Sequence, residues 1–257
     1  MNTPKRKAKP ASLMTENKPK RAKKTPSAAT HKKKFAVSNE SSLHRTLKFG
    51  YAGPGGKTEV EIGEYVADGI RKDGEYIEVQ TGSFAPLKKK VKEFAANGRV
   101  RIIHPIAVSK KIEVYGEDGA FLYSRKSPLK GSPWDFFDAL LHAPELPLIR
   151  RVTVEIVLAD IIEKRVKDGK GARRRKGVSI KDRELSAWHE NILLKKPADY
   201  LRFVPFKKLE EFTVSQLAER AQVDKWKAGK ALYVLTKMKI VKKTGKKGNA
   251  WLYVRNR

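Results

Sequence analysis

The distribution of charge along the chain decides which parts of it can fold. Residues 1–36 contain twelve Lys or Arg, four prolines and a single acid, so this segment has too little apolar surface to form a core. Residues 201–257 carry fifteen basic and four acidic residues, whereas residues 37–200 carry thirty basic and 23 acidic ones. Only the middle of the chain therefore has enough acids to build a carboxylate site.

The formal net charge of +29 in 257 residues indicates a polyanionic partner, and nucleic acid is the first candidate. We interpret residues 1–36 as a disordered basic arm that adds affinity for phosphates. Its lysine clusters resemble a bipartite nuclear localisation signal, so we expect a nuclear protein in a eukaryote and a cytoplasmic, nucleoid-associated one in a bacterium. No apolar run is long enough to span a membrane, and the absence of cysteine excludes disulfides and thiolate zinc sites.

Apolar periodicity in residues 37–108 predicts a helix, a strand hairpin, a second helix and a strand. The expected elements are a helix over 39–52 capped by Ser38 or Asn39, strands over 58–71 and 75–81, a helix over 83–96 and a strand over 100–107. Residues 109–200 are expected to extend this core with further β structure. The elements expected there are a hairpin over 110–124 that turns at 116–119, a helix over 134–141, a strand over 152–164, a basic loop over 164–176 and a strand over 177–182.

The turn between the two central strands fixes which side chains face each other. A three-residue loop that ends in a left-handed Gly74 is a common hairpin closure. This register pairs Ile70 with Tyr76, Gly69 with Ile77, Asp68 with Glu78, and Val66 with Gln80. Because directly paired residues share a face, Asp68, Glu78 and Gln80 converge on one side of the sheet. A two-residue loop would instead set Asp68 against Val79 and separate the acids.

Two carboxylates that face each other repel unless a cation lies between them. Mg²⁺ typically binds one or two carboxylates together with waters and phosphate oxygens, so the pair predicts a divalent-cation site. The alternative interpretation is that these polar residues lie on the solvated face of an antiparallel sheet.

The order helix, hairpin, helix, strand, with an acid on each hairpin strand, resembles the PD-(D/E)xK nuclease superfamily over roughly residues 38–108. Asp68 takes the place of the motif's Asp, with Ala67 where the motif has Pro, and Glu78 matches the second acid. Gln80 stands where Lys is usual, a departure also found in some restriction endonucleases. The resemblance implies an α+β fold with a restriction-endonuclease-like mixed sheet flanked by helices.

The resemblance also implies a catalytic arrangement. Mg²⁺ or Mn²⁺ would be held by Asp68, Glu78 and the backbone carbonyl of Val79, with Glu40 on the first helix as a further acid. The metal would activate a water to attack a phosphodiester. Gln80 can position that water but cannot act as a base. Lys88 or Lys90 on the next helix would supply the missing cation.

Residues 201–257 resemble a winged helix-turn-helix, with helices capped by Thr213 and Asp224 and a wing of two strands over 240–243 and 250–254. Trp226 and Trp251 are expected in its core. The residues expected to contact nucleic acid are Lys225, Lys227 and Lys230 on the second helix, Lys246 and Lys247 at the wing tip, and Arg173, Arg174, Arg175 and Lys176 in the basic loop. The alternatives are a solvated helix face or a protein-docking module.

The predicted function is Mg²⁺-dependent hydrolysis of DNA, of the repair, recombination or restriction type, by a nuclease core that a winged helix holds on its substrate. The rival hypothesis is a catalytically inactive nuclease-fold protein that binds DNA or regulates, and RNA is a further candidate partner because basic arms do not discriminate. A homodimer would suit cleavage of two strands, but the sequence has no interface signature. The expected domains are a tail over 1–36, a core over 37–108, its β-rich extension over 109–200 and the winged helix over 201–257.

Overall fold

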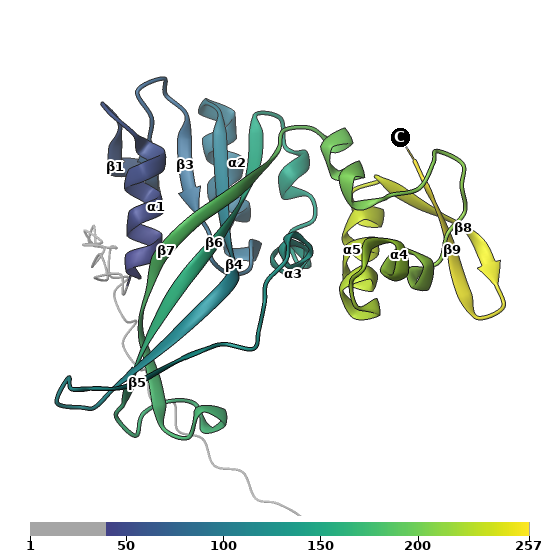
Figure 1. The fold of residues 1–257 in the computed structure, drawn as a ribbon. Coiled ribbons are helices and arrows are strands. Elements are labelled where there is room, and N and C mark those ends of the chain that lie inside the picture. Colours follow the sequence, from purple (N-terminus) through teal and green to yellow (C-terminus); the bar gives the residue numbers. More distant parts are fainter. Residues whose placement is uncertain (1–39, 257) are drawn as a thin grey trace, which may run out of the picture. The chain divides into compact units, whose positions relative to one another are not determined.

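The computed structural model describes residues 40–256, which form a mixed α+β sheet domain and a smaller C-terminal module (Figure 1). The basic tail and the caps expected at Ser38 and Asn39 lie outside the described residues. The helices of the sheet domain are α1 Ser42–Ala52, α2 Lys88–Asn97 and α3 Phe136–Leu140. Its strands are β1 Lys57–Ile62, β2 Tyr65–Ile70, β3 Tyr76–Val79, β4 Val100–Tyr115, β5 Phe121–Lys126, β6 Val152–Lys167 and β7 Val178–Leu194. Short 3₁₀ helices span Ala85–Leu87, Pro133–Asp135, Leu146–Leu148, Arg173–Arg175 and Pro197–Phe203.

The strands form one sheet in the order β1-β2-β3-β4-β6-β7, with β5 paired to β4. The pairs β1–β2 and β2–β3 are antiparallel, β3, β4 and β6 run parallel, and β7 returns antiparallel to β6. Parallel neighbours need a crossover, and α2 provides it between β3 and β4. The sequence therefore correctly predicted a mixed sheet flanked by helices.

The helices bury the apolar stripes that the periodicity predicted. Leu43, Leu47 and Tyr51 of α1 pack on Ile77 of β3 and on β4 and β6. The segment leading into and through α2 buries Phe84, Leu87, Val91 and Phe94 in a separate cluster. Because neighbouring residues of a strand point to opposite faces, the two helices cover opposite faces of the sheet. The cap of α1 is Ser41, whose Oγ accepts from the His44 N–H at 3.3 Å.

The expected strand over 58–71 is wrong, because the chain reverses within it and forms β1 and β2. The reversal occurs at Gly63, whose φ of 57° lies in the left-handed region that favours glycine. Other strands are longer than predicted, since β4 continues to Tyr115 and β7 to Leu194. Polar residues are frequent in these extensions, so their apolar pattern did not predict strands there.

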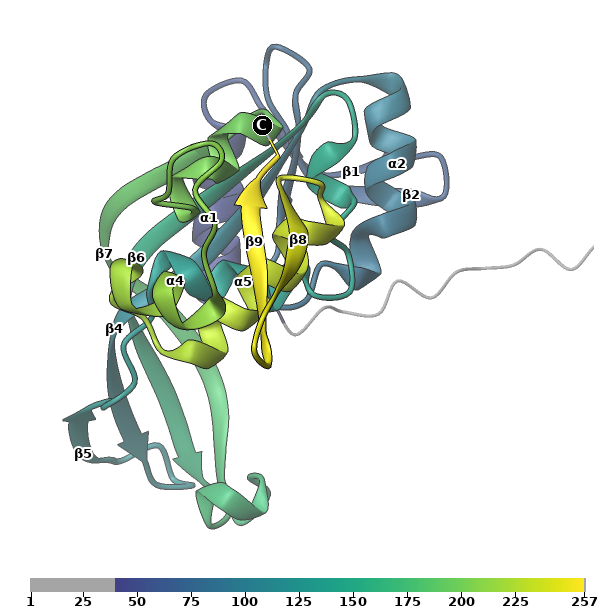
Figure 2. The same cartoon turned by 90° about the vertical axis from the view of Figure 1, so that its right-hand side faces the viewer.

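The extended parts of β4, β6 and β7 form an arm that runs on past the helices (Figures 1 and 2). The arm is held by the buried Glu163, which binds Arg165 at 2.5 Å, Arg183 at 3.1 Å and Lys110 at 3.3 Å. These three cations hold the pKa of Glu163 at about 2 despite its burial, which acts in the opposite direction. β5 pairs with this arm after the turn predicted at 116–119.

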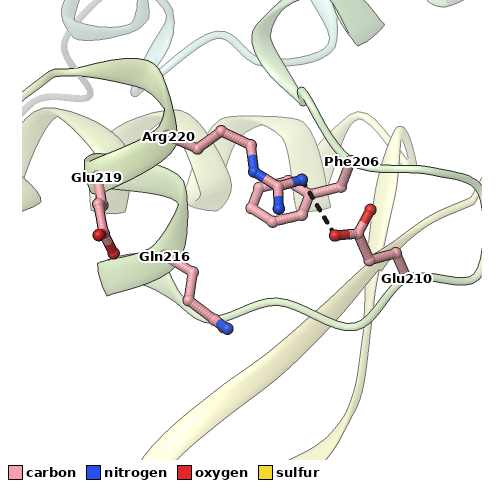
Figure 3. A pocket seen from close by; sticks show the side chains of 5 residues that line it. All are labelled: Phe206, Glu210, Gln216, Glu219 and Arg220. Atoms are coloured by element: carbon pink, nitrogen blue, oxygen red, sulfur yellow. Dashed lines mark hydrogen bonds and ion pairs between the residues drawn. The ribbon is translucent and has the colours of Figure 1, made fainter.

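The C-terminal module contains α4 Val214–Ala221, α5 Lys225–Lys237, β8 Val241–Lys247 and β9 Ala250–Arg255. The predicted caps are confirmed, because Thr213 accepts from the Gln216 N–H and Asp224 from the Lys227 N–H. Arg220 joins α4 to the preceding loop: its guanidinium lies 4.1 Å from the centre of the Phe206 ring and 3.0 Å from Glu210 (Figure 3). Within residues 40–256, no helix combines the length and the apolar composition needed to cross a bilayer.

The core positions predicted for Trp226 and Trp251 are wrong. Trp226 is 73% exposed and Trp251 42% exposed. The inward stripe of α5 is instead formed by the smaller Ala228, Leu232 and Leu235, which are buried. The hydrophobic core of the module therefore forms without either indole ring.

Replacing Gly229 by alanine is expected to stabilise the protein. Gly229 lies in the interior of α5, and a Cβ there would meet only Val214 Cγ1 within 4 Å, at an ordinary 3.9 Å. Removing the backbone freedom of glycine from the unfolded chain should raise the free energy of unfolding by up to about 1 kcal/mol, or the melting temperature by roughly 2–4 °C. Thermal unfolding followed by circular dichroism checks this, and a lower melting temperature would contradict it.

Candidate functional site

The candidate site lies where β2 and β3 stop pairing. The predicted register is confirmed at Gly69 opposite Ile77 and at Ile70 opposite Tyr76, and the backbone ladder ends there. Beyond the end of the ladder, two side-chain carboxylates accept hydrogen bonds from backbone N–H groups in place of backbone carbonyls. Asp68 Oδ2 accepts from the Val79 N–H at 2.8 Å, and Glu78 Oε1 accepts from the Asp68 N–H at 3.3 Å. The two predicted acids therefore meet in the gap between the separating strands.

A lysine from α2 reaches this gap. Lys90 Nζ lies 2.6 Å from Glu78 Oε2, and both side chains are largely buried. An ammonium so close to a buried carboxylate offsets part of the cost of keeping the acid ionised. Of the two lysines expected to substitute for the motif lysine, Lys90 is the one beside the acids. Lys88 instead pairs with Glu145 at 2.8 Å.

On its other side, Asp68 contacts His44 of α1. Glu40, which was predicted on this helix, lies just before it, because α1 begins at Ser42 after the cap Ser41. His44 Nε2 lies 3.3 Å from Asp68 Oδ2 and 3.5 Å from Glu40 Oε1. Glu40 is also bound by the buried Lys48 at 2.9 Å, and the same ammonium reaches Glu59 at 2.8 Å. Glu40 is therefore linked to the acid pair through His44.

Within residues 40–256, the side chain of Gln80 makes no hydrogen bond to Asp68 or Glu78 and binds elsewhere. Beyond Val79 the chain pairs with β4, since the Gln80 N–H donates to Ile103 O at 2.8 Å. The side-chain amide of Gln80 donates to the backbone carbonyl of Ser83. The backbone carbonyl of Gln80 lies 2.6 Å from Nδ1 of the buried His104. The predicted pairing of Val66 with Gln80 is absent because the β2–β3 ladder ends at Gly69 and Ile77.

The two acids differ in their readiness to ionise. Burial, assisted by the negative charge of Asp68, raises the pKa of Glu78 to about 7, although Lys90 opposes the shift. Burial would also raise the pKa of Asp68, but the hydrogen bond from His44, the charge of Lys90 and the Val79 N–H outweigh it and lower that pKa. At neutral pH Asp68 is ionised and Glu78 is near the midpoint of its titration.

Within residues 40–256, no group of three or more Asp, Glu, His or Cys side chains is arranged to hold a metal ion. The acids that meet are the pair Asp68 and Glu78. A cation with few protein ligands, such as Mg²⁺, binds one or two carboxylates and keeps several waters. The donor set of this gap, with the carbonyl of Val79 beside it in the chain, is chemically suited to a hard cation.

The basic residues predicted to contact nucleic acid fall into two groups. Lys227 binds Asp135 at 2.6 Å and Lys230 binds Asp138 at 2.8 Å, so both face α3 of the sheet domain. This corrects the expectation that they face DNA. The others remain on the surface: Lys225, Lys246, Lys247, Arg173, Arg174 and Lys176 are exposed and Arg175 is half-buried.

The arm carries a concentrated cationic site. A pocket of about 200 Å³ is lined by Tyr123, Arg125, Arg165 and residues 174–176, together with apolar side chains. No acid lines it. Residues 174–176 of the basic loop predicted over 164–176 therefore lie beside arginines from β5 and β6, which the sequence did not connect.

His44 and Lys48 are two residues of the site that were not among the predicted site residues. The signal for His44 was its position four residues after Glu40, a spacing that brings side chains together in helical geometry. The signal for Lys48 was another step of four residues. Contact with Asp68 depends on how α1 packs on the sheet, which periodicity does not give.

Comparison with known proteins gives a family but no activity. A family model described as "Domain of unknown function (DUF8091)" matches residues 41–195. A protein described as "Uncharacterized protein" from Treponema pallidum (strain Nichols) is 31% identical over 146 residues, which cover 57% of this chain and 58% of that protein. The chain thus spans less than two thirds of that relative, and no solved structure matches it. Because the family model covers more than half of the chain and includes Asp68, Glu78 and Lys90, this protein belongs to the DUF8091 family.

Proposed function

We propose that this protein is a DNA-binding, metal-dependent deoxyribonuclease. The observation that carries the proposal is the meeting of Asp68, Glu78 and Lys90 at the point where β2 and β3 separate. A buried acid beside a half-buried one, with different titration behaviour and a cation next to them, is typical of functional sites rather than of a solvated sheet face.

The order of elements supports the resemblance to PD-(D/E)xK nucleases. Helix α1 is followed, after β1, by the antiparallel pair β2–β3, helix α2 and strand β4. This is the order expected for that superfamily, with the acids on the two paired strands. The cation differs in origin, because Lys90 comes from α2 instead of standing two residues after Glu78. We infer that Lys90 takes the place of the motif lysine.

The oxygens of Asp68 and Glu78, with the carbonyl of Val79, would hold Mg²⁺ or Mn²⁺. Such an ion lowers the pKa of a bound water and neutralises charge on a phosphate. Two contacts orient the Asp68 carboxylate: one with His44 Nε2 and one with the Val79 N–H, which donates to it. Lys90 would stabilise negative charge that develops on the phosphoryl oxygens.

The exposed cations supply the affinity for DNA. Lys225, Lys246 and Lys247 of the C-terminal module have no acidic partner among residues 40–256, and this holds also for Arg174 and Lys176 on the arm. Cations without acidic partners favour binding of phosphates, with a steep dependence on salt. The capped helices α4 and α5 and the strands β8 and β9 support the proposed winged helix.

Incubation of the protein with linear, supercoiled and branched DNA, with and without Mg²⁺ or Mn²⁺, tests this function. We expect cleavage that requires the metal and stops when a chelator is added. RNA of the same sequence serves as the competing substrate, and cleavage of RNA alone would reassign the substrate. Salt-sensitive DNA binding without cleavage under any of these conditions would refute the nuclease proposal.

The second candidate function is a DNA-binding protein without catalysis. The observation that favours it is the 2.6 Å contact of Lys90 with Glu78, because an ammonium there already neutralises the acid. Calorimetric titration with Mn²⁺ separates the two candidates. A nuclease of this type should bind the ion, whereas a protein in which Lys90 permanently replaces it should show no binding heat.

A further inference from the structure

Three large aromatic side chains of the C-terminal module lie on its surface. Besides Trp226 and Trp251, Tyr233 is 50% exposed. Each of these rings has a lysine ammonium above it, at 5.1 Å for Lys230 over Trp226, 5.8 Å for Lys237 over Tyr233, and 4.3 and 4.6 Å for Lys243 and Lys246 over Trp251. Exposed aromatic rings interleaved with cations are the feature that proteins use to bind single-stranded nucleic acid.

Two of these rings line a pocket of about 400 Å³ at the junction of α3 and α5. Trp226 and Tyr233 lie seven residues apart on α5, so they share one side of the helix, and Gly229 between them has no side chain to fill the space. Leu141 and His142, which follow α3, form the opposite wall. The pocket is therefore mostly apolar and has aromatic sides.

The charge around the pocket selects the kind of occupant. No acidic residue lines it, and two of its lining residues, Lys225 and Lys230, are basic. Lys230 is bound to Asp138, whereas Lys225 has no acidic partner within residues 40–256. A flat, apolar group that carries phosphate beside it matches an aromatic pocket with a cation at its edge. A nucleotide has this composition.

We propose that the pocket between α3 and α5 binds an unpaired nucleobase of a single-stranded nucleic acid, by stacking on Trp226 and Tyr233, with Lys225 at the adjacent phosphate. Bases within a duplex already stack on each other, so an unpaired base is the one that can enter. The inference rests on the proposed nucleic-acid partner and is independent of hydrolysis. It extends the substrate class to DNA with a single-stranded segment.

The test compares the affinity of the full chain for a fluorescent oligothymidine and for an abasic strand of equal length, by anisotropy. Trp226→Ala removes the larger ring at an exposed position and leaves every charge in place. We expect affinity for oligothymidine to fall roughly five- to a hundred-fold, with an unchanged salt slope and no loss on the abasic strand. Trp226→Phe should restore most of the affinity.

The matched control is Leu209→Ala, which removes an 82% exposed apolar side chain of the same module outside the pocket. It should leave both affinities unchanged. Equal losses of Trp226→Ala on the oligothymidine and the abasic strand, or no loss on either, would overturn the inference. An acidic peptide serves as a competitor. If it displaces both strands equally well from the wild-type protein, and if Trp226→Ala but not Leu209→Ala abolishes this competition, the pocket would be a protein-docking site instead. None of these outcomes bears on metal-dependent cleavage, which is measured separately.

Discussion

Replacing Asp68 by asparagine is expected to lower metal-dependent DNA cleavage by at least about a hundred-fold, because it removes a charged ligand from the proposed cation site. The amide oxygen of asparagine can still accept from the Val79 N–H, which Asp68 Oδ2 binds at 2.8 Å. The separation of β2 and β3 should therefore persist. DNA binding should be unchanged, since the phosphate-binding cations are untouched.

Two measurements distinguish this result from misfolding. Calorimetric titration of Mn²⁺ should show binding to the wild type and none to Asp68→Asn. The charge-matched control is Glu61→Gln on β1, where the acid is exposed and no contact of Glu61 reaches the site. Control and wild type should cut at the same rate. Cleavage by Asp68→Asn at the rate of the control would remove Asp68 from the site.

Replacing Glu78 by glutamine is expected to stabilise the protein at alkaline pH and to have little effect near pH 4.5. The pKa of Glu78 is raised from 4.5 to about 7 in the fold, chiefly by burial and then by the charge of Asp68. The folded state thus binds the proton more tightly than the unfolded state does. The stabilisation that this bound proton gives to the fold is complete below about pH 4.5 and is lost as the pH rises through about 7.

The difference between the two pKa values corresponds to about 3 kcal/mol, and glutamine resembles the protonated acid at every pH. Urea unfolding at pH 5 and pH 8.5 measures the effect for wild type, Glu78→Gln and the control Glu61→Gln. The gain for Glu78→Gln should appear at pH 8.5 and shrink toward pH 5, while the control should stay within about 0.5 kcal/mol at both. A gain that is independent of pH would show that Glu78 titrates normally.

The two predictions concern the same site: Asp68→Asn should lower cleavage activity, whereas Glu78→Gln should raise the stability of the protein at alkaline pH. A buried acid that lowers stability at neutral pH is unexpected in a sheet unless its ionised form is used. Addition of Mn²⁺ should therefore stabilise the wild type most at pH 8, where the free acid is most costly, and should not stabilise Glu78→Gln to the same extent. Lys90 lowers this cost and does not remove it.

Local sequence determined most of the helices and the register of the central hairpin. Gly74 has a φ of 81°, as the three-residue turn requires, and that turn alone places Gly69 opposite Ile77. The caps Thr213 and Asp224 and the apolar stripe of α1 were likewise readable, because each depends on residues within a few positions of one another. The turn at Gly63 was missed because a single glycine inside a strand pattern equally marks a bulge.

Tertiary structure decided what surrounds the two acids and which residues are free. Where the β2–β3 ladder ends, which lysine reaches Glu78, and that His44 contacts Asp68 all depend on how α1 and α2 pack against opposite faces of the sheet. The same is true of Lys230, which Asp138 binds, and of Trp226, which stays exposed. Periodicity and turn geometry fix relations between residues close in the chain. Contacts between distant elements are chosen by the packing of complete side chains, which no local pattern contains.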